Sequence, residues 1–199
     1  NELSTGCFGY TDVEQKIRTD GNSVFEWGST TKLLVWSSVL QLYEQGRVDL
    51  DRDVRDYLPE DFLKNLRFDT PVTMLHLMNH NAGFQEMLWD VFSDSEDNMP
   101  ELGELLSHRQ PEQIYEPGRV TAYSNWSVAL AGYIVECIAG QPFYEYVNQH
   151  IFAPLGMKHS SLKPDYSDNA FVREGWDRLV CYTTDRERLE PSRYFIPIY

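Results

Sequence analysis

The sequence predicts an α+β fold in which a mostly helical lobe packs on an antiparallel sheet. Residues 3–18 have the pattern of two short strands joined by a turn. Two longer segments, residues 29–45 and residues 124–138, carry apolar side chains at helical spacing. Strand-like residues return only at 180–183. We expect the helices between these strand segments to form the lobe that packs on the sheet, with the active site between lobe and sheet.

The chain is expected to form a single partial domain. Residues 1–28 supply the first hairpin of the sheet, residues 29–160 the helical lobe, and residues 161–199 a return segment toward the sheet. The chain begins without an initiator Met and closes on Tyr199 without a tail, so it reads like a piece of a longer protein.

Composition limits the possible partners. With 42% hydrophobic residues the chain can bury a core, and its net charge of −14 disfavours binding to nucleic acid or anionic membranes. No apolar run reaches the roughly 18 residues of a membrane span, so membrane contact is not visible in this chain. Its cysteines, Cys7, Cys137 and Cys181, are far apart and odd in number, and we expect buried or idle thiols rather than a disulfide framework.

The N-terminal strands are short. Cys7–Tyr10 is apolar and aromatic, Thr11 and Asp12 suit a turn, and Lys16–Arg18 can form the return strand. We expect an exposed hairpin without a function of its own.

The segment 29–45 is the clearest helix, and Gly46 is its expected C-terminal stop. Its apolar residues lie nearly all round the helix, which predicts a buried element. They are Leu33, Leu34, Trp36, Val39, Leu40, Leu42 and Tyr43. A polar connection with a possible short helix follows, through Pro59.

A second helix is expected from Met74, with Thr73 as its N-cap, ending at residues 79–83. His76 and His80 have the i, i+4 spacing of some metal sites. A third ligand is not evident and the HExxH pattern is absent, so we expect structural histidines and no metal.

Further elements follow in order. Residues 87–92 form an amphipathic patch, residues 93–98 an acidic stretch expected to be a solvated loop, and residues 101–109 a short helix. A turn at 116–118 precedes a long helix that starts at Ser124 or Asn125. Gly140 should stop that helix, Pro142 should open another that ends at 154–157, and residues 180–183 should form a strand.

The main candidate for chemistry is the pair Ser29 and Lys32. Positions i and i+3 of a helix share a face, so a hydroxyl and an amine meet at a helix N-terminus. A serine hydroxyl needs a base to act as a nucleophile, and Lys32 can serve if burial and nearby positive charge lower its pKa. A second Ser-x-x-Lys at 160–163 lies in a polar segment before Pro164 and is interpreted as a chance match.

A second proton carrier is expected near Ser29. Tyr123 and Asn125 fit, because residues i and i+2 of an extended loop point the same way. The alternative is a core tyrosine followed by a capping Asn125. A second Tyr-x-Asn at 146–148 is expected in mid-helix, where i and i+2 do not share a face.

Together these stretches resemble the serine β-lactamase and penicillin-binding protein superfamily. The most similar branch is that of the class C β-lactamase-related serine hydrolases, which include D-alanyl-D-alanine carboxypeptidases and small esterases. The resemblance covers roughly residues 5 to 160, in the family's order. The matching segments are Phe25–Ser29, Gly46–Asp51, Met74–Phe84, Glu116–Gly118, Tyr123–Asn125 and Pro154–Met157.

The resemblance implies a role for each site residue. Ser29 would be the acylated nucleophile, with its N–H as half of an oxyanion hole, and Lys32 its base partner. Tyr123 would be the second acid/base group, and Asn125 would bind the substrate amide or help to place Lys32. The implied substrate is a small molecule or peptide: a D-amino acid peptide, a β-lactam or a small ester. No metal or organic cofactor is implied, and the expected location is extracytoplasmic, in the cell envelope or beyond.

The resemblance implies that the C-terminal strands of the family's sheet are missing from this sequence, and one family motif is missing with them. The family has a Lys or His, then one residue, then Gly, on a strand that gives the other oxyanion N–H. No Lys or His of this sequence is followed two positions later by Gly. A truncated or non-catalytic fragment that acts as a binding or structural domain therefore stays open. So does a plain acidic globular domain with accidental motifs.

Overall fold

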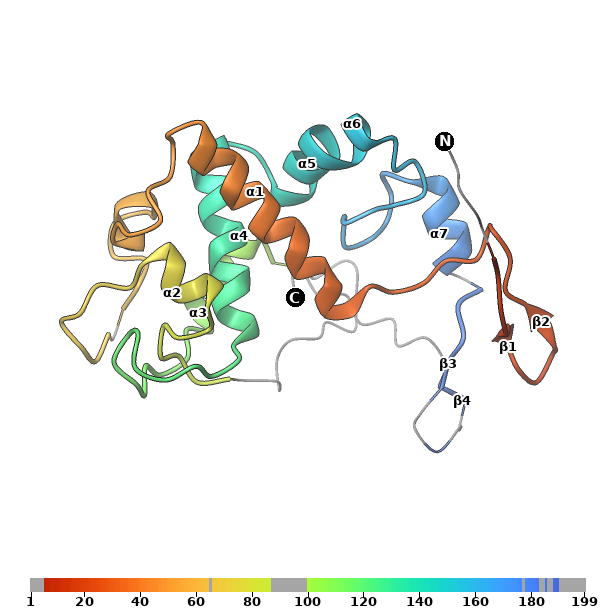
Figure 1. Ribbon diagram of the computed structural model, residues 1–199, viewed down its shortest axis with the longest axis horizontal. Coiled ribbons are helices and arrows are strands. Elements are labelled where there is room, and N and C mark those ends of the chain that lie inside the picture. The colour runs from red at the N-terminus through yellow and green to blue at the C-terminus, as the bar shows by residue number, and fades with distance from the viewer. Residues whose placement is uncertain are drawn as a thin grey trace.

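Two crossing helices hold the centre of the helical lobe (Figure 1). The computed structural model describes residues 6–64, 66–86, 100–176, 178–182, 185 and 188–189. Helix α1 (Lys32–Glu44) follows the 3-10 turn η1 (Gly28–Thr31) and packs against α4 (Asn125–Ala139). α4 is apolar along most of its length and is buried almost throughout, so it forms the axis of the core.

The shorter helices surround α4. α2 (Met74–Met78), α3 (Leu102–His108), α5 (Phe143–Val147) and the 3-10 turn η2 (Val54–Tyr57) all contact it. α5 continues through a π-helical turn, η4 (Asn148–Phe152), into α6 (Ala153–Leu155).

The sequence predicted most of these helices correctly. Ser124 caps α4 through its side chain, Thr73 caps α2, and Gly46, Gly140 and Gly156 follow their helices with left-handed backbones. α7 (Ala170–Trp176) was not predicted.

The expected burial of α1 on all sides is wrong. Leu33 is 63% exposed, Leu40 43% and Tyr43 49%, and the three lie along one face of the helix. The opposite side faces α4 and the core, where Val35, Val39 and Leu42 are fully buried. A helix can thus be apolar all round although the described elements cover only part of it.

The strands form two separate antiparallel pairs. β1 (Tyr10–Asp12) pairs with β2 (Ile17–Arg18), and β3 (Cys181–Tyr182) pairs with β4 (Arg188–Leu189). The Oη of Tyr182 accepts a hydrogen bond from the N–H of Val13 at 2.8 Å, which links the two pairs. The predicted N-terminal hairpin is therefore present, and β3 lies within the predicted strand at 180–183, whereas β4 was not predicted.

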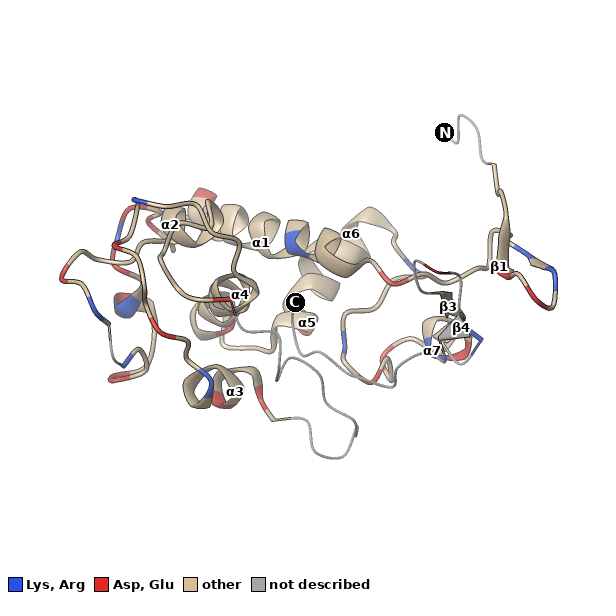
Figure 2. Ribbon diagram, turned by 90° about the horizontal axis from the view of Figure 1, so that it is seen from below, with Lys and Arg blue, Asp and Glu red and all other residues tan. Residues whose placement is uncertain are grey.

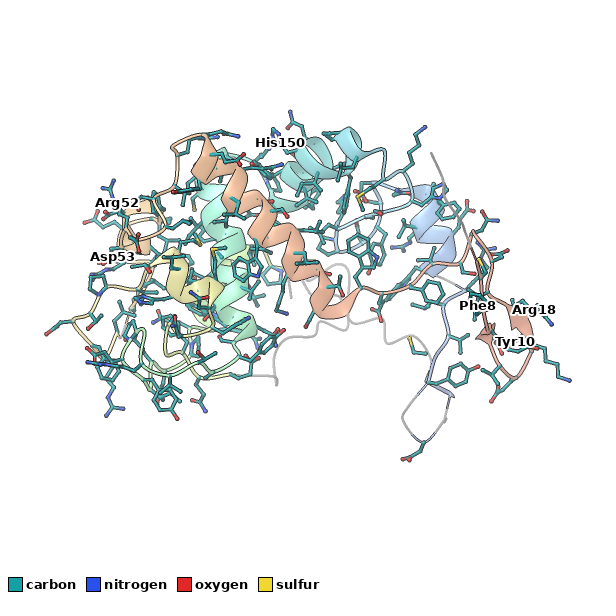
Figure 3. All side chains as sticks on the ribbon, viewed as in Figure 1. Phe8, Tyr10, Arg18, Arg52, Asp53 and His150 are labelled. Carbon is teal, nitrogen blue, oxygen red and sulfur yellow. The ribbon has the colours of Figure 1, made fainter. Side chains whose placement is uncertain are left out.

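The turn of the first hairpin was misplaced. Asp12 belongs to β1, and the turn follows at residues 13–16. The buried Asp12 carboxylate accepts a hydrogen bond from the N–H of Gln15 at 2.8 Å, so this residue stabilises the turn from its first position rather than lying within it. The hairpin is exposed as expected: Phe8 and Tyr10 lie at the opposite end of the molecule from Arg52 and Asp53 (Figure 3).

The remaining sequence expectations concern surface properties. The acidic residues of the described part of the chain are spread over loops and helices (Figure 2). Cys7 and Cys137 are exposed and Cys181 is intermediate, so the three thiols are free but not buried. None of the described helices combines the length and apolarity needed to cross a membrane. The amphipathic patch, the acidic stretch and the final ten residues lie outside the described residues.

Candidate active site

Ser29 and Lys32 meet at the junction of η1 and α1. The Lys32 ammonium donates a hydrogen bond to Ser29 Oγ, with 3.1 Å between Nζ and Oγ. Gly28 has φ of +51°, a left-handed backbone that favours glycine, and it turns the chain just before Ser29. Ser29 is exposed, whereas Lys32 is only 6% exposed. The turn therefore presents the hydroxyl to solvent and keeps the amine beneath it.

Tyr123 brings a third polar group to the same point. Its Oη lies 2.8 Å from Ser29 Oγ, although 94 residues separate the two in sequence. The Lys32 Nζ also lies over the Tyr123 ring, 5.1 Å from the centroid. Tyr123 is 48% exposed, so it is not a core tyrosine. A hydroxyl placed between an amine and a phenol has a proton acceptor and a proton donor within reach.

Asn125 is the first residue of α4, and it is held by a residue that the sequence did not single out. Its backbone N–H donates to Glu86 Oε2 at 2.7 Å, and its Nδ2 donates to Glu86 Oε1 at 2.9 Å. Since an ionised carboxylate only accepts, these bonds fix the orientation of the amide. Among the described residues, the hydrogen bonds of Asn125 go to Glu86 and not to Lys32.

His80 contacts three consecutive residues around Tyr123. Its carbonyl accepts from the N–H of Ala122 at 2.8 Å, and its Nδ1 accepts from the N–H of Ser124 at 3.2 Å. Its ring stacks on that of Tyr123, with centroids 4.5 Å apart and an angle of 30° between planes. Burial and the positive charge of Lys32 lower the pKa of His80.

The other histidine, His76, supports the helix start. Its N–H donates to Thr73 Oγ1 at 3.3 Å, and its Nδ1 accepts from the N–H of Thr73 at 3.2 Å, which completes a reciprocal cap of α2. Both histidines thus have structural partners.

The two competing motif copies have different surroundings. Lys163 Nζ contacts Ser167 Oγ at 2.5 Å and Asp165 Oδ1 at 3.5 Å, and no bond to Ser160 is seen in this part of the described chain. Tyr146 is 2% exposed, and its hydroxyl donates to Gln41 Oε1 at 3.2 Å inside the helical lobe. In the described chain, neither the Ser160 hydroxyl nor the Tyr146 hydroxyl is hydrogen-bonded to a lysine, as the Ser29 hydroxyl is.

Comparisons with known proteins agree with this fold. Residues 2–185 match the family model described as Beta-lactamase. PbpX of Bacillus subtilis (strain 168) is 26% identical over 187 residues, which is 92% of this chain and 45% of PbpX.

Solved structures show the same fold. A penicillin-binding protein homologue from Pyrococcus abyssi, described as octameric, superposes with a TM-score of 0.74 at 23% identity, over 95% of this chain and 44% of that one. A β-lactamase/D-alanine carboxypeptidase from Yersinia pestis, complexed with citrate, gives 0.70 at 25% identity, over 96% and 55%. The chain thus spans about half the length of the proteins that it matches. On the family match and the fold together, the chain belongs to the β-lactamase family of serine hydrolases, within the β-lactamase/transpeptidase-like superfamily.

Proposed function

We propose that the protein forms an acyl-enzyme at Ser29 and releases it to water. The observation that carries this proposal is the position of Ser29 Oγ, 3.1 Å from Lys32 Nζ and 2.8 Å from Tyr123 Oη. The proposed substrate is a D-amino acid peptide, a β-lactam or a small ester. The name of the Yersinia pestis neighbour, a β-lactamase/D-alanine carboxypeptidase, supports the first two classes.

In the proposed reaction, one proton passes from Ser29 to Lys32, and Tyr123 supplies one to the leaving group. The reacting form of the site is the one in which Lys32 has given up its extra proton. In that form Ser29 Oγ attacks the substrate carbonyl carbon while its proton passes to Lys32 Nζ. The N–H of Ser29, among the first of a helical segment, can donate to the oxyanion that forms. The leaving nitrogen or oxygen takes a proton from Tyr123, which recovers one from Lys32. Water then attacks the ester carbonyl. The bond between the acyl carbon and Ser29 Oγ breaks, one proton of the water passes to Oγ, and the remaining OH leaves as part of the product acid.

The test is to map the site of acylation. The protein is incubated with a fluorescent penicillin and, separately, with a fluorophosphonate, which reacts with activated serines whatever their natural substrate. Proteolysis and mass spectrometry then locate each adduct. We expect the adduct on the peptide that contains Ser29. An adduct on the peptide that contains Ser160, or no adduct from either reagent, contradicts the proposal.

A second candidate is binding without turnover. The absence of Lys-x-Gly and His-x-Gly from the 199 residues favours it, because loss of one oxyanion donor costs about 100- to 1000-fold in rate. A protein of this kind is thermally stabilised by a β-lactam but gives no covalent adduct with it. Adduct formation followed by release of hydrolysed product supports the first candidate instead.

Replacing Lys32 with Met is expected to slow fluorophosphonate labelling by about 100- to 10,000-fold, the usual contribution of general acid–base catalysis. Met has a similar length and suits the 6% exposed position of Lys32, so the fold should persist. The matched control is Lys163→Met in the other Ser-x-x-Lys, whose labelling rate should equal that of the unmodified protein. Equal rates for both variants contradict a role of Lys32 as the base.

A further inference from the structure

His80 contacts Tyr123 with its ring and also binds the backbone of the residues on either side of Tyr123. Tyr123 is half exposed and follows a loop, so few contacts fix its phenol. His80 compensates by binding the backbone on both sides of it, at Ala122 and Ser124, and by stacking on the ring itself. The hydroxyl of Tyr123 is thereby held 2.8 Å from Ser29 Oγ.

This arrangement requires a neutral imidazole. The Nδ1 of His80 accepts a hydrogen bond from the N–H of Ser124, so the proton of the neutral ring is on Nε2. A protonated imidazole carries hydrogens on both nitrogens. Its Nδ1–H would then face the N–H of Ser124, and two donors repel each other. Protonation thus removes one of the contacts that fix Tyr123.

The groups around His80 come from several elements. Lys32 of α1 places a positive charge near the ring, and Trp36 of the same helix meets the ring edge-on, with centroids 6.5 Å apart. Glu86 follows His80 on the same segment of the chain, and its negative charge favours the protonated form, as an opposing and weaker influence than burial. The net effect is a pKa below the usual value near 6.5, so the ring is neutral at pH 7 and gains its proton only in more acidic solution.

We propose that His80 is a positioning residue for Tyr123 that works only in its neutral form, so that its protonation releases the phenol and imposes an acid limb on the acylation rate. The proposal rests on the acyl-enzyme function proposed above. His80 need not touch the substrate; it acts through the placement of Tyr123.

The decisive variant is His80→Asn. His80 has φ of +53°, a left-handed conformation that Asn tolerates better than most residues. The Asn Oδ1 takes the place of Nδ1 as an acceptor for the N–H of Ser124. Unlike the imidazole, the Asn amide does not titrate between about pH 4 and pH 9. We expect the acid limb with the His80 midpoint to disappear, while the rate on the alkaline side stays within about tenfold of the unmodified protein.

Two matched variants complete the set. His80→Gly keeps the left-handed backbone but removes both the acceptor and the ring, and it should lower the fluorophosphonate labelling rate about 10- to 100-fold at every pH. His76→Asn changes the neighbouring histidine, which caps α2 and does not contact Tyr123 in the described structure, and the acid limb should remain. An acid limb that persists in His80→Asn at the midpoint of the unmodified protein overturns the proposal.

A second measurement is independent of activity. In NMR spectra of the protein, the His80 ring signals, assigned by their loss in His80→Asn, give the midpoint of its titration directly. The Tyr123 ring signals, assigned with Tyr123→Phe, should shift with that same midpoint. Tyr123 signals that stay constant while His80 titrates refute the coupling. If no adduct forms at Ser29, the proposed function fails, and the NMR result still decides the relation between His80 and Tyr123.

Discussion

Ser29→Ala should abolish covalent labelling by both a fluorescent penicillin and a fluorophosphonate, whereas Ser160→Ala should label like the unmodified protein. Both serines stand three residues before a lysine, so the two variants are matched in sequence. Only Ser29 lies within hydrogen-bond distance of its lysine and of a phenol in the described structure. The comparison therefore tests spatial context rather than the motif.

The expected effect on turnover is large. Without the hydroxyl no ester intermediate can form, and loss of a serine nucleophile lowers kcat by on the order of 10⁴- to 10⁶-fold. The fold should be little affected, because Ser29 is exposed in a short 3-10 turn and the substitution removes only two side-chain hydrogen bonds. Circular dichroism and a melting curve serve as the control. Labelling of Ser29→Ala at the unmodified rate would place the nucleophile elsewhere.

Local spacing explains what the sequence predicted about the site. Ser29 and Lys32 occupy one helical turn, so their proximity follows from backbone geometry alone. Tyr123 stood out because an extended Tyr-x-Asn comes directly before a helix. The sequence pattern favoured the pairs at 29–32 and 123–125 over their second copies. Of these residues, the structure brings Ser29, Lys32 and Tyr123 together, whereas Asn125 is hydrogen-bonded to Glu86.

Contacts between distant segments were not predictable in this way. Glu86 is 39 residues from Asn125, and His80 is 44 residues from Ser124, so no periodicity connects them. The sequence drew attention to His80 only through its i, i+4 spacing from His76, which is the spacing of some metal sites. The partners of His80 in the structure are instead residues 122–124. A carboxylate facing an Asn at a helix N-terminus becomes visible only once α4 is placed against the segment before residue 87.

The pattern of apolar residues predicted which segments form helices, but it did not predict which helix faces other elements cover. It predicted α1 correctly, yet it could not say that Leu33, Leu40 and Tyr43 would face outward in the described part of the chain. Hydrophobic periodicity records which side chains avoid water, while burial also depends on which elements are present to pack on them. Similarly, the first hairpin was predicted, but the hydrogen bond from the Gln15 N–H to Asp12, which places its turn one step later, was not.

The largest expected effect on stability comes from Gly83→Ala, which should lower the free energy of unfolding by about 3 kcal/mol. Gly83 has φ of +87°, and a Cβ built there would lie 1.9 Å from the carbonyl oxygen of Tyr115. The Gly83 carbonyl also accepts from the N–H groups of Ile114 and Tyr115, at 2.8 and 3.2 Å. The two backbones therefore cannot separate without losing hydrogen bonds. The estimate adds about 1–2 kcal/mol for the left-handed conformation to about 1–3 for overpacking.

Gly46→Ala separates these two contributions. Gly46 also has a left-handed backbone, with φ of +69°, but a Cβ there would meet nothing within 4 Å. Its substitution should cost only the conformational part, about 1–2 kcal/mol. Urea unfolding of both variants measures the difference, which reports the clash with Tyr115.

Because Gly83 lies between His80 and Glu86, the two residues that hold Tyr123 and Asn125, its substitution should also slow labelling of Ser29, whereas Gly46→Ala should not. Equal stability losses in the two variants would show that the segment at 83 moves away from 115 freely, and an unchanged labelling rate in Gly83→Ala would show that the site is placed independently of that contact.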